Sequence, residues 1–226
     1  MPESKKFELS PSVSIIVAGV LVAGAIVFVN LNPSQPTVAL GEPTVQVDIA
    51  PPNAGDYILG AQSAPIVLIE YSDFQCPYCA MIHPTLKQIV AESDGEVAWV
   101  YRHLPLESLH PQAFPSALAA ECIGEQLGQS GFWAFADDVF ADQSGMNSVR
   151  YQALAGRLGA NIEQFNACVE SEKYLSKIET QALDAQSSGG TGTPFTVVLN
   201  TETGKTGVVP GAVPYARVQS VINSVR

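Results

Sequence analysis

Two cysteines separated by two residues, Cys76 and Cys79, are the part of this 226-residue sequence best suited to chemistry. The run 65–71 before them is hydrophobic, which predicts a buried strand. Pro77 favours the first position of a helix, because its φ is fixed and it has no N–H to leave unpaired. Cys76 is therefore expected at a helix N-terminus, where free backbone N–H groups and the helix dipole stabilise a thiolate.

A thiolate in this position predicts a reversible redox pair. The thiolate is the reacting form of cysteine, and a second thiol one turn further along can attack a mixed disulfide formed at the first. Cys76 is predicted to be the nucleophile, because it is nearer the helix end and the more exposed. Cys79 is predicted to be the resolving thiol and to be buried.

Two alternative interpretations of such a cysteine pair are half of a zinc site and a structural disulfide. A zinc site needs two more ligands, usually a second close pair. The remaining cysteines, Cys122 and Cys168, are far apart in the sequence, and the three histidines, His83, His103 and His110, are interpreted as structural. We therefore favour redox chemistry that needs neither a metal ion nor a bound cofactor.

The segment from Glu70 to Cys79, Glu-Tyr-Ser-Asp-Phe-Gln-Cys-Pro-Tyr-Cys, is followed by His83-Pro84 and resembles the active-site segment of the DsbA-like branch of the thioredoxin superfamily. The resemblance covers roughly residues 56–226. It continues through residues 101–105, 119–122, 132–133 and 192–194. It implies a thioredoxin-like α/β fold and the activity of an extracytoplasmic thiol–disulfide oxidoreductase.

The resemblance also implies roles for residues around the cysteines. Pro77 and Tyr78, between the two thiols, tune the redox potential in this superfamily and are expected to contact substrate. Thr193-Pro194 is expected to contain a cis peptide bond and to present the backbone of Thr193 to an extended substrate. The alternative for Pro194 is an ordinary trans proline at the start of a strand.

Glu70 lies at the end of the predicted strand, six residues before Cys76. A buried carboxylate is costly unless it is paired or functional. Glu70 matches the acidic residue under the active site of DsbA-like proteins, which assists proton transfer at the resolving thiol. The alternative is a carboxylate at a strand end that reaches solvent.

The rest of the domain is predicted to be a sheet interrupted by helices. Residues 96–102 are predicted to form a second strand. It should be parallel to the first, because a helix joins the two strands. About residues 107–186 are helical and exceed the single crossover that a thioredoxin fold needs, so they are predicted to form an inserted helical subdomain. Its first helices are expected around 117–127 and 132–140, and two strands and a helix close the chain.

Cys122 and Cys168 are both predicted to lie on apolar faces of helices in this insertion. An extracytoplasmic compartment is oxidising, so we expect a structural disulfide between them. The alternative is two buried thiols that act as small hydrophobic side chains.

The N-terminal residues predict a membrane anchor. Residues 13–31 carry no charge and are nearly long enough to span a bilayer, whereas Lys5 and Lys6 precede them. The positive-inside bias places residues 1–12 in the cytoplasm and the rest of this single-pass protein outside the cell membrane. A cleaved signal peptide is the alternative. Proline-rich residues 32–55 are predicted to be a spacer before the domain at 56–226.

The net charge of −11 argues against nucleic acid as a partner, because the phosphate backbone is also negative. The function predicted first is a dithiol oxidase that introduces disulfides into cysteine-containing exported proteins through Cys76 and Cys79. A membrane redox partner would then recycle the two cysteines. The alternatives are a disulfide isomerase or reductase of the same fold, and a non-catalytic thioredoxin-like chaperone.

Overall fold

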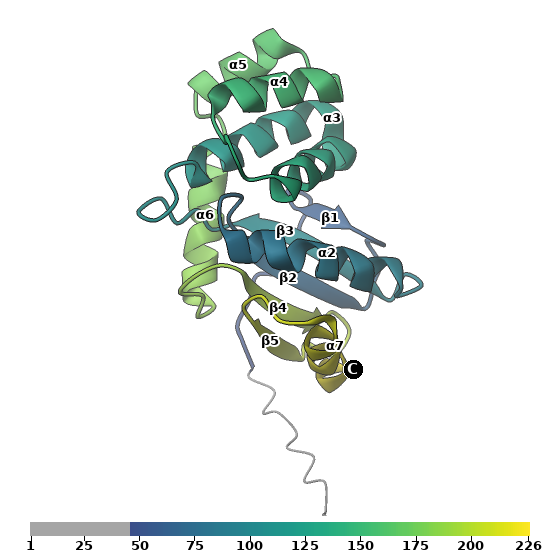
Figure 1. Cartoon of the computed structure of the whole chain (residues 1–226). Helices are drawn as coiled ribbons and strands as arrows, with labels where there is room; N and C mark the ends of the chain where they lie inside the picture. Colours follow the sequence, from purple (N-terminus) through teal and green to yellow (C-terminus); the bar gives the residue numbers. More distant parts are fainter. Residues whose placement is uncertain (1–45) are drawn as a thin grey trace, which may run out of the picture. The chain divides into compact units, whose positions relative to one another are not determined.

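A mixed sheet forms the centre of the computed structural model, which describes residues 46–226 (Figure 1). The strands lie in the order β1-β3-β2-β4-β5. Their bounds are β1 Tyr57–Leu59, β2 Ile66–Ser72, β3 Val97–His103, β4 Phe195–Asn200 and β5 Thr206–Pro210. The predicted parallel pairing of β2 with β3 is confirmed, and the other neighbours in the sheet are antiparallel.

Helices cover both faces of this sheet. Their bounds are α2 Pro77–Ala91, α3 Ala113–Ala141, α4 Ser148–Leu158, α5 Ile162–Glu170, α6 Leu175–Ser187 and α7 Tyr215–Val225. Side chains of α2, α3 and α7 join the larger hydrophobic core on one face, and α6 packs on the smaller core of the other face. In Figure 1, α3, α4 and α5 form a separate helical layer beyond the edge strand β1.

The central strand β2 is buried at all seven positions, as its hydrophobic sequence predicts. Because side chains alternate along a strand, Leu68, Glu70 and Ser72 point to the face that carries α2. Leu68 contributes to the larger core on that face, whereas Glu70 and Ser72 are buried polar residues. The strand therefore carries two polar side chains into the interior, directly before the loop that leads to Cys76.

The helix α3 spans two helices that the sequence predicts separately. Gly128 interrupts it with φ 65° and ψ −154°, a backbone conformation that glycine adopts more readily than other residues. This kink lies between the predicted helices at 117–127 and 132–140. The two halves of α3 therefore change direction at one residue without an intervening loop.

A disulfide joins Cys122 in α3 to Cys168 in α5, so the structure contains the pairing expected from the sequence. Both cysteines are buried.

Removing the disulfide with the double substitution Cys122→Ala/Cys168→Ala is expected to lower the free energy of unfolding by about 4 kcal/mol, because the bond closes a loop of 46 residues. Urea unfolding measures the change. An unaltered midpoint and slope would show that the bond contributes nothing.

The folded part of the chain begins earlier than predicted. Residues 46–55, expected to belong to a spacer, lie against the domain where Val47 N donates to Thr206 Oγ1 at 2.7 Å. The buried Arg102 donates to the carbonyl oxygens of Ala50 and Pro51 at 2.9 and 3.0 Å. A buried guanidinium needs such partners, and this need explains why the segment packs here.

The predicted anchor, residues 13–31, lies outside the described residues. From residue 46 onward, no helix has the length and apolar character needed to cross a membrane.

Candidate active site

Cys76 is the N-cap residue of α2, and Pro77 occupies the first turn, as predicted. The backbone N–H groups of Cys79 and Ala80 donate to the Cys76 carbonyl at 3.1 and 3.2 Å. The first turn contains no acidic residue. The sulfur of Cys76 therefore lies at the positive end of the helix dipole without a nearby carboxylate on the same turn.

The loop before Cys76 is fixed by Asp73, a residue that was not among the predicted site residues. Its buried carboxylate accepts hydrogen bonds from Gln75 N at 2.8 Å and Leu106 N at 3.0 Å. His110 Nδ1 lies 2.7 Å from the same carboxylate. Asp73 thereby ties the cysteine loop to the segment that leads into α3.

Gln143, which follows α3, is a second positioning residue that was not predicted. Its Nε2 donates to the carbonyl oxygens of Phe74 and Cys76 at 2.8 and 3.0 Å. The helical insertion therefore holds the backbone on both sides of Gln75. No local sequence signal marks Gln143, because its partners lie 69 and 67 residues earlier in the chain.

Both cysteines of the pair are free thiols and buried. Cys76 is 3% exposed and Cys79 is 0% exposed. The prediction that Cys79 is buried is confirmed, but Cys76 is exposed far less than expected. The turn that carries Thr193 explains this, because the carbonyl oxygen of Thr193 lies 3.5 Å from Cys76 Sγ.

The two thiols have pKa values shifted in opposite directions. The pKa of Cys76 is lowered to about 5, first by a hydrogen bond from the Cys79 thiol. The Thr193 side chain and the backbone N–H groups of Cys79 and Tyr78 also lower it, and together these groups outweigh burial. The pKa of Cys79 is raised well above its ordinary value by burial, by its bond to Cys76 and by the charge of Glu70.

This difference predicts how the thiols react with iodoacetamide. In the reduced protein, the alkylation rate of Cys76 should stay constant above about pH 7. It should fall as the pH decreases through about 5, because the thiolate is then protonated. In Cys79→Ala the midpoint should move upward, since the largest cause of the low pKa is lost. A wild-type midpoint near the free cysteine value of about 8.5 would contradict the assignment.

The peptide bond between Thr193 and Pro194 is cis, as the resemblance implied. Pro194 is buried, and β4 begins at the next residue, Phe195. Tyr78, between the two cysteines, is 60% exposed. The turn at Thr193 thus lies against the sulfur of Cys76, and Pro77 and Tyr78 both lie in the first turn of α2.

Glu70 is 1% exposed, so the alternative of a carboxylate that reaches solvent does not hold. Its Oε1 accepts a hydrogen bond from Ser72 Oγ at 2.8 Å, and its Oε2 has no partner. Burial raises the pKa of this carboxyl to about 8, against the effects of the Ser72 and Trp99 side chains. Glu70 can therefore hold or release a proton near neutral pH, and its charge acts on Cys79.

Each histidine pairs with a carboxylate. His83 Nε2 lies 2.7 Å from Asp137, and His103 Nε2 lies 3.0 Å from the buried Glu121. His110 pairs with Asp73, as described above. Among residues 46–226, no group of three or more His, Cys, Asp or Glu residues is placed to hold a metal ion.

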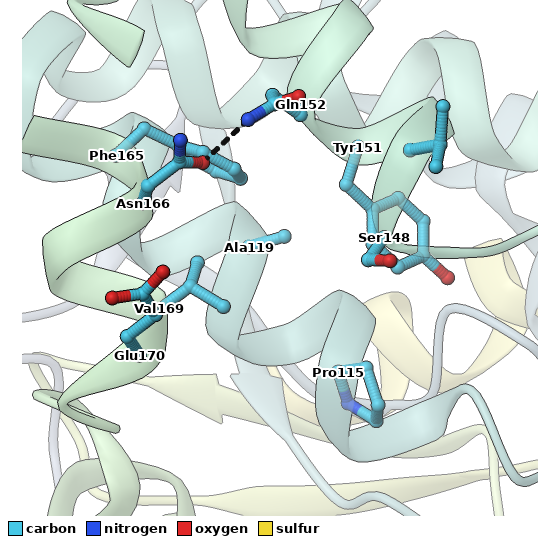
Figure 2. A pocket seen from close by; sticks show the side chains of 10 residues that line it. Pro115, Ala119, Ser148, Tyr151, Gln152, Phe165, Asn166, Val169 and Glu170 are labelled. Atoms are coloured by element: carbon cyan, nitrogen blue, oxygen red, sulfur yellow. Dashed lines mark hydrogen bonds between the residues drawn. The ribbon is translucent and has the colours of Figure 1, made fainter. Parts of the chain in front are cut away.

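A pocket of about 250 Å³ lies in the helical insertion, away from the groups that act on the cysteines (Figure 2). Figure 2 shows side chains of α4 facing those of α5 across it, and Gln152 Nε2 donates to Asn166 Oδ1 at 2.8 Å. Its wall includes Tyr151, whose hydroxyl donates to Gln112 Oε1 at 3.3 Å. The lining is mostly apolar, and the pocket contains neither cysteine of the redox pair.

The candidate active site combines three features. A buried strand ends in the cysteine loop, Cys76 is the N-cap of a helix, and a cis-proline turn lies against the Cys76 sulfur. The family model described as thioredoxin matches residues 53–222. The chain belongs to the thioredoxin family. Its fold is similar to the crystal structure of Pseudomonas aeruginosa DsbA2, with a TM-score of 0.66 and 26% identity over 78% of this chain and 97% of that one.

Two further thioredoxin-fold structures resemble the chain in fold. Bacillus subtilis BdbD gives a TM-score of 0.65 at 20% identity, covering 79% of this chain and 97% of that one. Wolbachia pipientis alpha-DsbA1 gives 0.65 at 23% identity, covering 77% and 92%. These findings confirm the predicted DsbA-like member of the thioredoxin superfamily, a thioredoxin-like α/β fold with a helical insertion.

Sequence relatives of this thioredoxin-family chain include much longer proteins. The Na(+)/H(+) antiporter NhaA 1 of Mycolicibacterium vanbaalenii is 34% identical over 141 residues, which are 62% of this chain and 22% of the antiporter. NhaA 3 of Salinispora tropica is 32% identical over 142 residues, with 62% and 21% covered. The chain thus spans about a fifth of the length of the curated relatives it matches.

Proposed function

We propose that the chain is an extracytoplasmic protein thiol–disulfide oxidoreductase, and that it acts as a dithiol oxidase. Its Cys76–Cys79 disulfide accepts two electrons from a pair of substrate thiols. The products are a substrate disulfide and the reduced Cys76/Cys79 pair. The substrates are cysteine-containing exported proteins, and a membrane redox partner restores the disulfide.

The observation that carries this proposal is the placement of the free Cys76 thiol at the N-cap of α2, one turn before the free Cys79 thiol, where the pKa of Cys76 is lowered to about 5. The thiolate exists only in the reduced form, so whatever stabilises it makes the disulfide a stronger oxidant. Thioredoxin has a thiol pKa of about 7. At pH 7 this difference favours the reduced form by about 2 kcal/mol more than in thioredoxin, which corresponds to about 50 mV.

The turn at Thr193 supports the binding of an extended substrate. Its carbonyl oxygen lies 3.5 Å from Cys76 Sγ. A polypeptide that pairs its backbone with this turn would bring its own cysteine next to Cys76. The exposed Tyr78 ring, two residues after Cys76, offers an apolar surface to the same polypeptide. Specificity would then come mainly from the backbone, which suits an enzyme that acts on many exported proteins.

The compartment follows from the sequence and belongs to the same proposal. Residues 13–31 anchor the chain in the cell membrane, with residues 1–12 in the cytoplasm and the catalytic domain outside. Protease added to intact cells should remove the domain and leave a membrane-bound fragment. A mature N-terminus at residue 26 or later would instead show a cleaved signal.

The direct test mixes the oxidised chain with a reduced, unfolded protein that needs disulfides for its activity. An oxidase consumes the thiols of that substrate stoichiometrically and reduces its own Cys76–Cys79 disulfide. If substrate activity is recovered only when the starting substrate carries scrambled disulfides, the chain is an isomerase. A chaperone would instead lower the aggregation of the substrate protein without consuming its thiols. Either result would replace the proposed oxidase function.

A further inference from the structure

Ser72, the last residue of β2, is a buried hydroxyl beside the buried acid Glu70. It is 1% exposed, and its Oγ donates to Glu70 Oε1 at 2.8 Å. Cys79 is buried in α2, on the face of the sheet to which Glu70 and Ser72 point, and the Ser72 side chain lowers the pKa of the Cys79 thiol. Ser72 therefore interacts with both the buried acid and the buried sulfur.

Glu70 itself does not bond to Cys79. Within residues 46–226, Ser72 donates the hydrogen bond that reaches Glu70 Oε1, and Glu70 influences Cys79 through its charge. The Trp99 side chain also lowers the pKa of Glu70, but an indole N–H can only donate, so Trp99 cannot pass a proton on. Its second oxygen, Oε2, is buried without a partner. A proton that passes between Glu70 and Cys79 thus needs an intermediate group, and a hydroxyl serves because it donates and accepts at once.

The other polar groups facing this site are less suited to that role. Tyr101, paired with Glu70 in the sheet, has a pKa raised well above its ordinary value by burial, so it keeps its proton. His103 has a pKa lowered by burial, and its Nε2 is engaged with Glu121, which also binds Lys177. The hydroxyl of Thr196, also beside Glu70 in the sheet, has no partner.

We propose that Ser72 is a catalytic proton relay between Glu70 and Cys79. This inference rests on the oxidoreductase function proposed above. When a substrate thiolate attacks Cys76, the Cys76–Cys79 bond breaks and Cys79 leaves as a thiolate. Ser72 then donates its proton to the Cys79 sulfur and takes a proton from the Glu70 carboxyl. The net change is one proton moved from Glu70 to Cys79.

The same path works in reverse when Cys79 resolves a mixed disulfide at Cys76. The Cys79 thiol gives its proton to Ser72, and Ser72 gives its own to the Glu70 carboxylate. The Cys79 thiolate attacks Cys76, the new Cys76–Cys79 bond forms, and the substrate leaves as a thiolate. No further oxidant or reductant is required, because the mixed disulfide supplies the oxidising equivalent.

The test separates the two steps of oxidation by glutathione disulfide. Reduced protein first forms a Cys76–glutathione mixed disulfide, and Cys79 then displaces the glutathione. Rapid quenching with acid and mass measurement gives both rates from pH 5 to 10. In the wild type, the second rate should rise with pH and level off above the pKa of Glu70, near 8.

Ser72→Ala should slow the second step about a hundredfold at pH 8, the usual size of an acid–base contribution. Its rate should keep rising with pH without levelling, because only free Cys79 thiolate then reacts. Ser72→Thr restores a hydroxyl and should restore the plateau. Ser116→Ala is the matched control, because it removes a buried hydroxyl that donates to the backbone carbonyl oxygens of Gln112 and Ala113 and whose side-chain interaction is with Tyr151.

A wild-type pH profile in Ser72→Ala, or equal slowing in Ser72→Thr, would overturn the relay. If Ser72→Ala does not fold, the relay can be tested with the wild type alone, by measuring the rate of the second step in mixtures of H2O and D2O. Two protons in flight give a curved dependence of the second rate on deuterium content, and a linear dependence contradicts the relay. Failure of the first step in the wild type would instead refute the proposed oxidoreductase function.

Discussion

Cys76→Ser is expected to abolish turnover of dithiol substrates, with a loss of about a thousandfold or more. The reason is that the serine hydroxyl cannot form the mixed disulfide, and no other free thiol replaces Cys76. Cys79 is buried, and its pKa is raised well above the ordinary value, so it remains an unreactive thiol at neutral pH. A continuous assay of thiol consumption measures the loss.

Cys79→Ser is the matched variant for this prediction. It retains the nucleophile, so a disulfide-containing substrate should still react once with Cys76. The resulting mixed disulfide should persist, because no resolving thiol follows, and it should appear as a covalent adduct under non-reducing conditions. The roles would be wrong if Cys79→Ser kept full turnover or if Cys76→Ser formed the adduct instead.

Glu70→Gln is expected to stabilise the protein while it slows the chemistry. The pKa of Glu70 is about 8 in the folded protein, whereas an unfolded glutamate has a pKa of about 4.3. Below pH 4 the carboxyl is neutral in both states and the two proteins should be equally stable. As the pH rises, the unfolded chain releases this proton first, so the wild type loses stability between about pH 4 and 8.

At pH 7 the gain in Glu70→Gln should be about 3 to 4 kcal/mol, and it should increase until about pH 8 and then stay constant. Urea unfolding of the reduced proteins at several pH values measures it. Glu121→Gln is the control of opposite sign. Burial opposes ionisation of Glu121, but bonds from His103 and Lys177 outweigh it and lower its pKa, so this substitution should destabilise. Equal stability of wild type and Glu70→Gln at pH 8 would contradict the account.

Such a result would explain why a buried acid persists in the interior. Glu70 reduces stability at the pH where the enzyme works, and it holds a proton close to Cys79. Functional groups commonly carry this kind of stability cost. Glu70→Gln cannot exchange a proton, so it should slow the steps in which Cys79 gains or loses one.

The junction of β2 and α2 was predictable because its signals are local. A hydrophobic run predicts the strand, Pro77 predicts the helix start, and together they place Cys76 at the N-cap. The cis bond at Pro194 came from the resemblance to a family, since residue types alone do not distinguish it from a trans bond. The pairing of Cys122 with Cys168 needed the predicted helical faces and an expected compartment.

The parts that could not be predicted depend on contacts between distant segments. Asp73 and Gln143 hold the cysteine loop through bonds that span 33 to 69 residues. The burial of Cys76 depends on Thr193, which lies 117 residues later. The packing of residues 46–55 depends on the buried Arg102, which in the sequence reads as an ordinary residue at the end of a strand.

The redox potential of the Cys76/Cys79 pair tests the central claim most directly. Equilibration with glutathione buffers at pH 7, followed by trapping of the free thiols, gives this value. The lowered pKa of Cys76 predicts a potential about 50 mV above that of thioredoxin, or about −220 mV, and higher still where other contacts favour the reduced form. A potential at or below the thioredoxin value of about −270 mV would contradict the account and identify the protein as a reductant.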